Sequence, residues 1–315
     1  MKWVTYEAGE GVRAGVLDGE SVRGLAAGTS LESLLEGGNL AEAGADALRA
    51  PTEIRAVDDV RLLAPLRRPQ SVRDGLCFLD HLRNCYRVLG RDGVLDPVWS
   101  QSPAFYFANR DAIVGPYDDV PVAPGSVMFD LELEVGAVVG RGGRDLHPDR
   151  AEDHIVGYTL YNDWTARDHQ VVDMAQGIGM AKSKDSAITL GPALVTADEL
   201  AGHRVDGRLA FGLSASVNGR ELTRGTLAQM DWTFGELLAY ASRGTDLRPG
   251  AVIGSGTVPR GCLLEHVDTA DLADFSGWLQ PGDVVSLRGE GLGETRQSVT
   301  AGSDVIPLRG SAQEA

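Results

Sequence analysis

Acidic side chains recur at spacings that could hold a metal ion. Glu132 and Glu134 are two residues apart in the alternating run 129–135. In a β-strand their side chains would share one face, roughly 7 Å apart. Asp163, in the segment YNDW, and Asp74 offer two more carboxylates. Because carboxylate ligands suit Mg²⁺, Mn²⁺ or Ca²⁺, these residues predict a site for one hard divalent cation.

A plainer interpretation exists for the glutamate pair, since an isolated Glu-x-Glu is more often the wet face of an amphipathic strand. Nothing in the sequence offers the Cys/His cluster that zinc or copper prefers. Cys77, Cys85 and Cys262 form no CxxC pair and no even disulfide framework. We therefore interpret the three cysteines as packing residues of a protein from a reducing compartment.

Composition excludes several classes of function. The 315 residues carry a net charge of −16, so a nucleic-acid backbone or an anionic membrane would repel the protein. The first residues contain no apolar signal segment, and no run of about eighteen apolar residues occurs. These features predict a cytoplasmic globular protein whose partner is a small molecule.

The elements that must position the carboxylates divide the chain in two. Residues 1–65 contain short β-like runs and a helical segment from Ser30 to Ala50, and they predict a small N-terminal domain. From Arg73 to Leu89 apolar residues recur at helical spacing, which predicts a helix with Asp74 at or near its N-terminus. The Val-rich and Gly-rich runs that follow predict a mainly β, α+β catalytic domain over residues 66–315.

Several motifs in the second part occur together and in a fixed order. They are SPAFYF at 102–107, the Glu132-Leu133-Glu134 run, GYTLYNDWTARD at 157–168, GSGT at 254–257 and LQPGDVV at 279–285. In this order they resemble the fumarylacetoacetate hydrolase family. The resemblance implies a β-sandwich roll with a small N-terminal α/β domain, a Mg²⁺, Mn²⁺ or Ca²⁺ ion, a homodimer, and chemistry on a carbon–carbon bond beside a carbonyl.

The resemblance also implies roles for individual residues. Asp74, Glu132, Glu134 and Asp163 fall on the metal-ligand positions, and Lys184 on that of an active-site lysine, with Lys182 as the alternative register. Tyr106, Gln170 and Thr257 match substrate contacts, and the arginine expected downstream of His81 is either Arg87 or Arg91. Arg167 and Asp168 are interpreted as a structural ion pair or loop brace.

A histidine and a glutamate complete the pattern of the family's hydrolases. His81 follows Asp74 by seven residues, and Glu265 follows the segment GCLL. Two helical turns would place Asp74 and His81 on one face with roughly 10 Å of rise between them. The resemblance then implies that Glu265 orients His81 and that His81 activates water.

The predicted function is metal-dependent hydrolysis of a C–C bond in a 1,3-dicarbonyl acid, such as an acylpyruvate or a fumarylacetoacetate-like compound. One alternative is β-keto acid decarboxylation or keto–enol tautomerisation on the same scaffold, and another is a catalytically inactive metal-binding homologue. Gly75 and Leu76 stand where the family's hydrolases carry aromatic residues, and Met174 where they carry a tyrosine, so the sequence leaves the substrate open.

Overall fold

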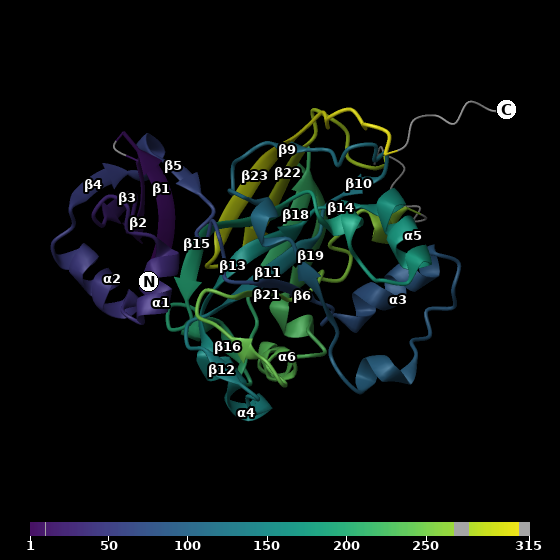
Figure 1. Ribbon diagram of the computed structural model, residues 1–315, viewed down its shortest axis with the longest axis horizontal. Coiled ribbons are helices and arrows are strands. Elements are labelled where there is room, and N and C mark those ends of the chain that lie inside the picture. Colours follow the sequence, from purple (N-terminus) through teal and green to yellow (C-terminus); the bar gives the residue numbers. More distant parts are fainter. Residues whose placement is uncertain (10, 268–276, 309–315) are drawn as a thin grey trace.

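Two sheets dominate the computed structural model, which describes residues 1–9, 11–267 and 277–308 (Figure 1). Among these residues twelve strands form one large sheet, of which ten follow in the spatial order β4 (Glu53–Ala56), β3 (Ser21–Gly24), β2 (Gly11–Asp18), β1 (Lys2–Ala8), β15 (Ile188–Thr196), β13 (Ile155–Asp163), β11 (Leu133–Val139), β21 (Val252–Gly254), β6 (Val72–Gly75) and β7 (Phe105–Ala108). In addition, β5 (Arg61–Leu63) pairs with β1, and β8 (Ile113–Val114) pairs with β15. The second sheet has the order β19 (Arg220–Thr226), β18 (Gly212–Val217), β22 (Val284–Gly289), β23 (Gly293–Thr300) and β9 (Val120–Pro121).

Short ribbons and helices complete the described chain. Three two-stranded ribbons pair β10 (Phe129–Asp130) with β14 (Thr165–Ala166), β12 (Gly143–Arg144) with β20 (Asp246–Leu247), and β16 (Arg204–Val205) with β17 (Arg208–Leu209). The α-helices are α1 (Leu31–Gly37), α2 (Leu40–Arg49), α3 (Leu79–Val88), α4 (Pro148–Ala151), α5 (Arg167–Gln176) and α6 (Phe234–Ala241). None of the described helices is long and apolar enough to cross a membrane. The prediction of a mainly β, α+β fold is confirmed.

The N-terminal residues extend the large sheet. β1 pairs with β15 through Lys2 opposite Val195 and Trp3 opposite Leu194. The helical segment predicted from Ser30 to Ala50 is two helices, because Gly38 adopts a left-handed conformation with φ of 67° and ends α1. Trp3 packs into a core with residues of α1, β13 and β15.

The central strands lie between two covered faces. Every residue of β11 is buried, and so is nearly every residue of β13. β22 and β23 pack against β13 and β15, and in Figure 1 the second sheet lies against the large one. In β23 buried and exposed residues alternate, as expected for a strand with one face on the core. The result is a sandwich whose buried central strands can hold side chains in fixed positions.

The predicted helical position of Asp74 is wrong. Asp74 lies in β6, which is buried at every residue and pairs with β21 and β7. The helix begins only at Leu79, whose backbone N–H donates to Asp231 Oδ2 at 2.8 Å. Because its N-terminal partner comes from a distant segment, the local sequence could not locate the start of α3. Asp74 and His81 therefore do not lie two turns apart on one helix.

Candidate metal and catalytic site

Three of the predicted carboxylates meet on neighbouring strands. Asp74 belongs to β6, Glu134 to β11 and Asp163 to the end of β13. One oxygen of each lies within 4.8 Å of the others, and all three side chains are buried. Opposite ligands of a Mg²⁺ or Ca²⁺ ion are separated by about 4–5 Å, twice the metal–oxygen distance. The sheet thus brings these oxygens close enough to share one ion.

The strand between β11 and β6 leaves room for this cluster. Gly254 of β21 pairs with Gly136 on one side and with Asp74 on the other. A Cβ atom at Gly254 would overlap Asp74 Oδ1 and lie 3.1 Å from Glu134 Oε2. The absence of a side chain at this position is what lets the two carboxylates approach each other.

We expect Gly254→Ala to abolish divalent-cation binding and to destabilise the fold by about 1–3 kcal/mol, the usual effect of overpacking. The added methyl would push the Asp74 carboxylate away from Glu134. Calorimetric titration with Mg²⁺ and thermal unfolding would measure both effects. Gly212→Ala in β18 is the matched control, because its Cβ would have only Glu290 Oε2 nearby, at 3.8 Å. Mg²⁺ binding at wild-type strength in Gly254→Ala would contradict this account.

Burial and mutual repulsion act on the three carboxylates. Burial, followed by the charge of Asp163, raises the pKa of Asp74 to about 8. Burial and the neighbouring Asp74 raise the pKa of Glu134 well above its ordinary value. Burial also raises the pKa of Asp163, although Lys184 opposes that shift. Without a cation the cluster therefore retains protons near neutral pH, and a bound divalent ion would displace them.

The donor set fits a hard divalent ion. Asp163 Oδ1 is buried and has no hydrogen-bond partner among the described residues. A buried oxygen of this kind normally has a hydrogen-bond or metal partner. Three carboxylates with no nitrogen or sulfur atom in the group match the preference of Mg²⁺, Mn²⁺ and Ca²⁺.

Glu132 lies beside this cluster and contacts two cations. It immediately precedes β11, and its Oε2 accepts from Lys184 Nζ while its Oε1 accepts from Arg167 Nη2 at 2.7 Å. Lys184 Nζ also donates to Asp163 Oδ2 at 2.5 Å. Although burial acts in the other direction, the two cations hold the pKa of Glu132 well below its ordinary value. Glu132 as a metal ligand stays a prediction.

The lysine register can be compared directly in the structure. Lys184 is buried, and the Asp163 and Glu132 carboxylates raise its pKa against the opposing effect of burial. Lys182 is 70% exposed in its side chain and pairs with Asp185 instead. Of the two lysines, Lys184 is therefore the one that reaches the carboxylates.

The predicted substrate contacts lie around the carboxylates. The Tyr106 hydroxyl donates to Asp163 Oδ2 at 2.7 Å, and Thr257 Oγ1 donates to Glu134 Oε1 at 3.3 Å. Gln170 Oε1 accepts from Arg167 Nη1 at 3.1 Å. These contacts orient the site's own charged groups, and the substrate-binding roles of the three residues stay predictions.

Arg167 has a larger part in the site than the sequence indicated. The interpretation that it pairs with Asp168 is wrong, because its guanidinium binds Asp130 at 2.8 Å as well as Glu132. Asp168 does brace a loop, since it accepts from Ser126 Oγ and Val127 N. No sequence pattern indicated the buried Asp130 contact, because the pairing of β10 with β14 is what brings Asp130 and Arg167 together.

A buried histidine–carboxylate pair lies next to the metal-ligand candidates. His81 on α3 and Glu265 in the 3-10 helix Leu264–His266 are joined by a 2.9 Å contact between Nδ1 and Oε2. Glu265 Oε1 also accepts from Asn84 Nδ2 and from the backbone N–H of Arg260. Burial disfavours the charged ring, but Glu265 outweighs it and raises the pKa of His81 well above its ordinary value. The charge of His81 in turn contributes to the low pKa of Glu132. Glu132 forms an isolated β-bridge with Cys262, whose Sγ donates to Glu265 Oε2 at 3.5 Å, so this segment links the pair to Glu132.

The two candidate arginines both contact residues of α3, and Arg91 itself lies beyond the end of that helix. Arg87 Nη1 donates to Asn84 Oδ1 at 3.0 Å, and the Arg91 guanidinium lies 4.8 Å from the centre of the Tyr86 ring. Neither contact selects one of them as a substrate ligand. Met174 on α5 is 59% exposed, and Gly75 lies against Leu237 and the Gly254 carbonyl, which leaves no room for an aromatic side chain there.

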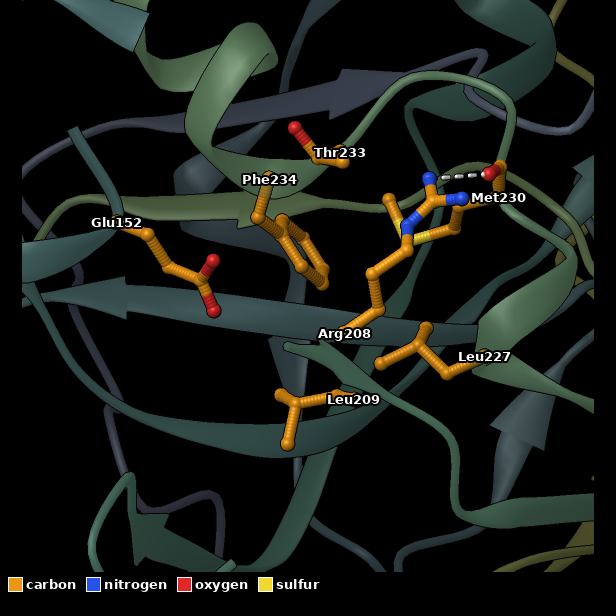
Figure 2. A pocket seen from close by; sticks show the side chains of 7 residues that line it. All are labelled: Glu152, Arg208, Leu209, Leu227, Met230, Thr233 and Phe234. Carbon is orange, nitrogen blue, oxygen red and sulfur yellow. Dashed lines mark hydrogen bonds between the residues drawn. The ribbon is translucent and has the colours of Figure 1, made fainter. Parts of the chain in front are cut away.

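A separate hollow lies away from these residues. Figure 2 shows it between Phe234, Leu209 and Leu227, where Arg208 donates to the Met230 carbonyl at 2.7 Å. Its volume is about 30 Å³, room for only a few water molecules. It shares no residue with the carboxylates or with the His81–Glu265 pair.

Comparisons with known proteins cover nearly the whole chain. A family model described as the C-terminal domain of fumarylacetoacetate hydrolase matches residues 70–300, and one described as Rv2993c-like, N-terminal, matches residues 1–65. The human mitochondrial oxaloacetate tautomerase FAHD2A is 32% identical over 215 residues, which are 68% of this chain and 63% of that protein.

Two bacterial proteins match over almost their full length. A putative hydrolase from Burkholderia multivorans is 30% identical over 96% of this chain and 99% of its own. The solved structure of the fumarylacetoacetate hydrolase from the psychrophile Exiguobacterium antarcticum superposes with a TM-score of 0.75 at 27% identity, over 96% of this chain and 99% of that one. The predicted sandwich-roll architecture is thereby confirmed.

Proposed function

Because the chain belongs to the fumarylacetoacetate hydrolase family, we propose that it is a divalent-metal-dependent hydrolase that cleaves a C–C bond in a 1,3-dicarbonyl acid. The observation that carries this proposal is the buried His81–Glu265 pair beside the carboxylates. Hydrolysis needs a group that takes a proton from water, and a histidine held by a carboxylate is the usual protein solution.

Asp74, Glu134 and Asp163 would hold the ion, with Glu132 as the fourth candidate ligand. We propose Mg²⁺, with Mn²⁺ or Ca²⁺ as substitutes, because the oxygen-ligand preferences of these ions overlap. When bound, such an ion supplies Lewis acidity that polarises a ketone and offsets the negative charge of a departing enolate. Tyr106 and Thr257 each hold one of the carboxylates in position through a hydrogen bond.

His81 would act on water through its second ring nitrogen. Glu265 accepts a hydrogen bond from Nδ1 of His81, which leaves Nε2 as the atom that can take a proton. Water that has lost this proton would attack the carbonyl carbon, and the bond to the neighbouring carbon would then break with its electron pair moving into the enolate. The proton on Nε2 would return to the carbon of that enolate, so that an acid and a ketone leave the site.

Lys184 and Gln170 would bind the oxygen atoms on which negative charge develops. Lys184 is fixed by two carboxylates, so its ammonium group is already oriented before substrate arrives. Donors oriented in this way contribute about 10²–10³-fold each to turnover in comparable sites. Arg167 orients both Glu132 and Gln170 and thereby positions this part of the site.

A second candidate function is keto–enol tautomerisation of a 2-oxo acid. The observation that favours it is the similarity to FAHD2A, which is named an oxaloacetate tautomerase. In that reaction His81 would move a proton between carbon and oxygen of the substrate, and water would not be consumed. The same residues could serve both reactions, so only the products separate them.

The decisive experiment is a panel of acylpyruvates, fumarylacetoacetate-like diketones and oxaloacetate, each incubated with Mg²⁺ or EDTA in oxygen-18 water. Hydrolysis predicts acid and ketone products, with the label in the new carboxylate and no reaction in EDTA. Label-free isomers of unchanged mass would replace the proposal with the tautomerase. Release of CO₂ would identify a decarboxylase, and turnover that is unaffected by EDTA would contradict the metal requirement.

The Glu265 carboxylate should set the pH dependence of turnover. Glu265 raises the pKa of His81, and His81 must be neutral to accept a proton. The increase of kcat/KM with pH should therefore have its midpoint above the ordinary pKa of histidine. In Glu265→Gln the rising limb should move to lower pH, while the maximal rate falls because the ring is held less firmly. A pH–rate profile measures both, and an unmoved limb would show that another group titrates.

A further inference from the structure

His81 belongs to a second cluster of possible metal ligands, made of His81, Cys85 and Cys262. One ligand atom of each lies within 4.8 Å of the others, and all three residues are buried. Cys85 follows His81 by one helical turn on α3, and its Sγ lies 3.7 Å from His81 Nε2. In a tetrahedral zinc site such N–S and S–S edges measure about 3.5–3.8 Å. The interpretation that the sequence offers no Cys/His cluster is wrong, because Cys262 reaches the helix from a distant segment.

Glu265 prepares the histidine for this role. Its Oε2 contacts His81 Nδ1 at 2.9 Å and accepts from Cys262 Sγ at 3.5 Å. Histidine ligands of metal ions typically donate their other ring N–H to a carboxylate, which fixes the tautomer with the ligating nitrogen free. In this protein that arrangement leaves Nε2 free, and Cys85 Sγ lies 3.7 Å from Nε2 and 3.9 Å from Nδ1.

We propose that His81, Cys85 and Cys262 form a binding site for a thiophilic divalent ion such as Zn²⁺, separate from the carboxylate site. Binding would displace one proton from each thiol and, from the protonated form of His81, the proton on Nε2, giving bonds from two Sγ atoms and from His81 Nε2, with water as the fourth ligand. Zn²⁺ and two thiolates sum to zero net charge, so the ligand set suits a buried location. Mg²⁺ would not compete, since it prefers oxygen ligands.

An ion at this site would control the reaction. The inhibitory role, unlike the binding itself, depends on the proposed function, in which Nε2 of His81 takes a proton from water. Because a nitrogen bound to Zn²⁺ has no free electron pair, the two roles exclude each other. Zn²⁺ should therefore inhibit an enzyme already saturated with Mg²⁺, and a chelator selective for Zn²⁺ should restore activity.

The test uses Co²⁺ as a spectroscopic probe, with the full chain saturated with Mg²⁺ and its thiols kept reduced by a phosphine. Co²⁺ bound to thiolates produces a strong charge-transfer absorption in the near ultraviolet, whereas Co²⁺ bound to oxygen ligands does not. We expect the band in wild type, weaker bands in Cys85→Ser and in Cys262→Ser, and an unchanged band in Cys77→Ala. Cys77 is the matched control, because it is a buried free cysteine outside the cluster.

The readout needs no substrate, so it stands apart from the proposed function. Absence of the thiolate band in wild type, or a band of wild-type intensity in either serine variant, would contradict the proposed site. Loss of the band in Cys77→Ala would contradict it as well. Circular dichroism and thermal unfolding show whether each variant is folded. In a competition with a chromophoric chelator, Glu265→Gln should bind Zn²⁺ about 10–100-fold more weakly, as expected when a carboxylate that orients a histidine ligand is removed. Unchanged affinity in that variant would contradict the role given to Glu265.

Discussion

Replacement of His81 by alanine should lower kcat by about 10²–10⁴-fold at saturating Mg²⁺, the range that a positioned general base contributes. The reason is that His81 is the base proposed to take the proton from water, and Glu265 can only hold the ring. Mg²⁺ affinity should be retained, because the ligand candidates Asp74, Glu134 and Asp163 do not include His81. Turnover of the best substrate from the panel and calorimetric titration with Mg²⁺ measure the two quantities.

The fold should survive this substitution. Glu265 would keep hydrogen bonds from Asn84 Nδ2 and from the Arg260 backbone N–H, so its buried carboxylate would not lose every donor. His147→Ala serves as the control, since this histidine is 71% exposed in its side chain and its hydrogen bond and ion pair both involve Asp149 at the start of α4. If kcat in His81→Ala stayed within about tenfold of wild type, a general-base role for His81 would be contradicted.

Elements whose signals are local in the sequence could be predicted, whereas contacts between distant segments could not. β11, β13 and β15 were readable because buried central strands are runs of apolar residues. β19 and β23 lack such an apolar run, since each turns a polar face outward and their charged residues dilute the strand pattern. The break between α1 and α2 rests on the left-handed Gly38, a signal that was present in the sequence.

In the site, too, single residues could be predicted from the sequence, whereas their contact partners from distant segments could not. Glu134 and Asp163 could be identified from motifs. The role of Gly254, which lies between β6 and β11 and leaves room there because it has no side chain, depends on the order of the strands in the sheet. Cys85 lies four residues after His81 and was visible as a neighbour on a predicted helix. Cys262 and Asp130 had no such signal, because only the folded chain brings them to His81 and Arg167.

Replacement of Lys184 by methionine should affect both catalysis and stability. We expect kcat to fall by about 10²–10³-fold, because a preoriented donor to developing negative charge is lost. Removing one partner of a buried ion pair typically costs about 3–5 kcal/mol, and Lys184 neutralises Glu132 and Asp163 together. Methionine keeps the apolar stem, so the change tests the charge rather than the packing. Steady-state kinetics and denaturant unfolding in EDTA report the two effects.

Lys182→Met is the matched control from the same short segment. Its ammonium group pairs with Asp185 at the surface, and exposed pairs contribute about 0–1 kcal/mol. We therefore expect near wild-type turnover and stability in this variant. Mg²⁺ should recover part of the stability lost in Lys184→Met, since a divalent ion would again neutralise Asp163. A large loss of turnover in Lys182→Met together with a small one in Lys184→Met would reverse the assignment of the two lysines.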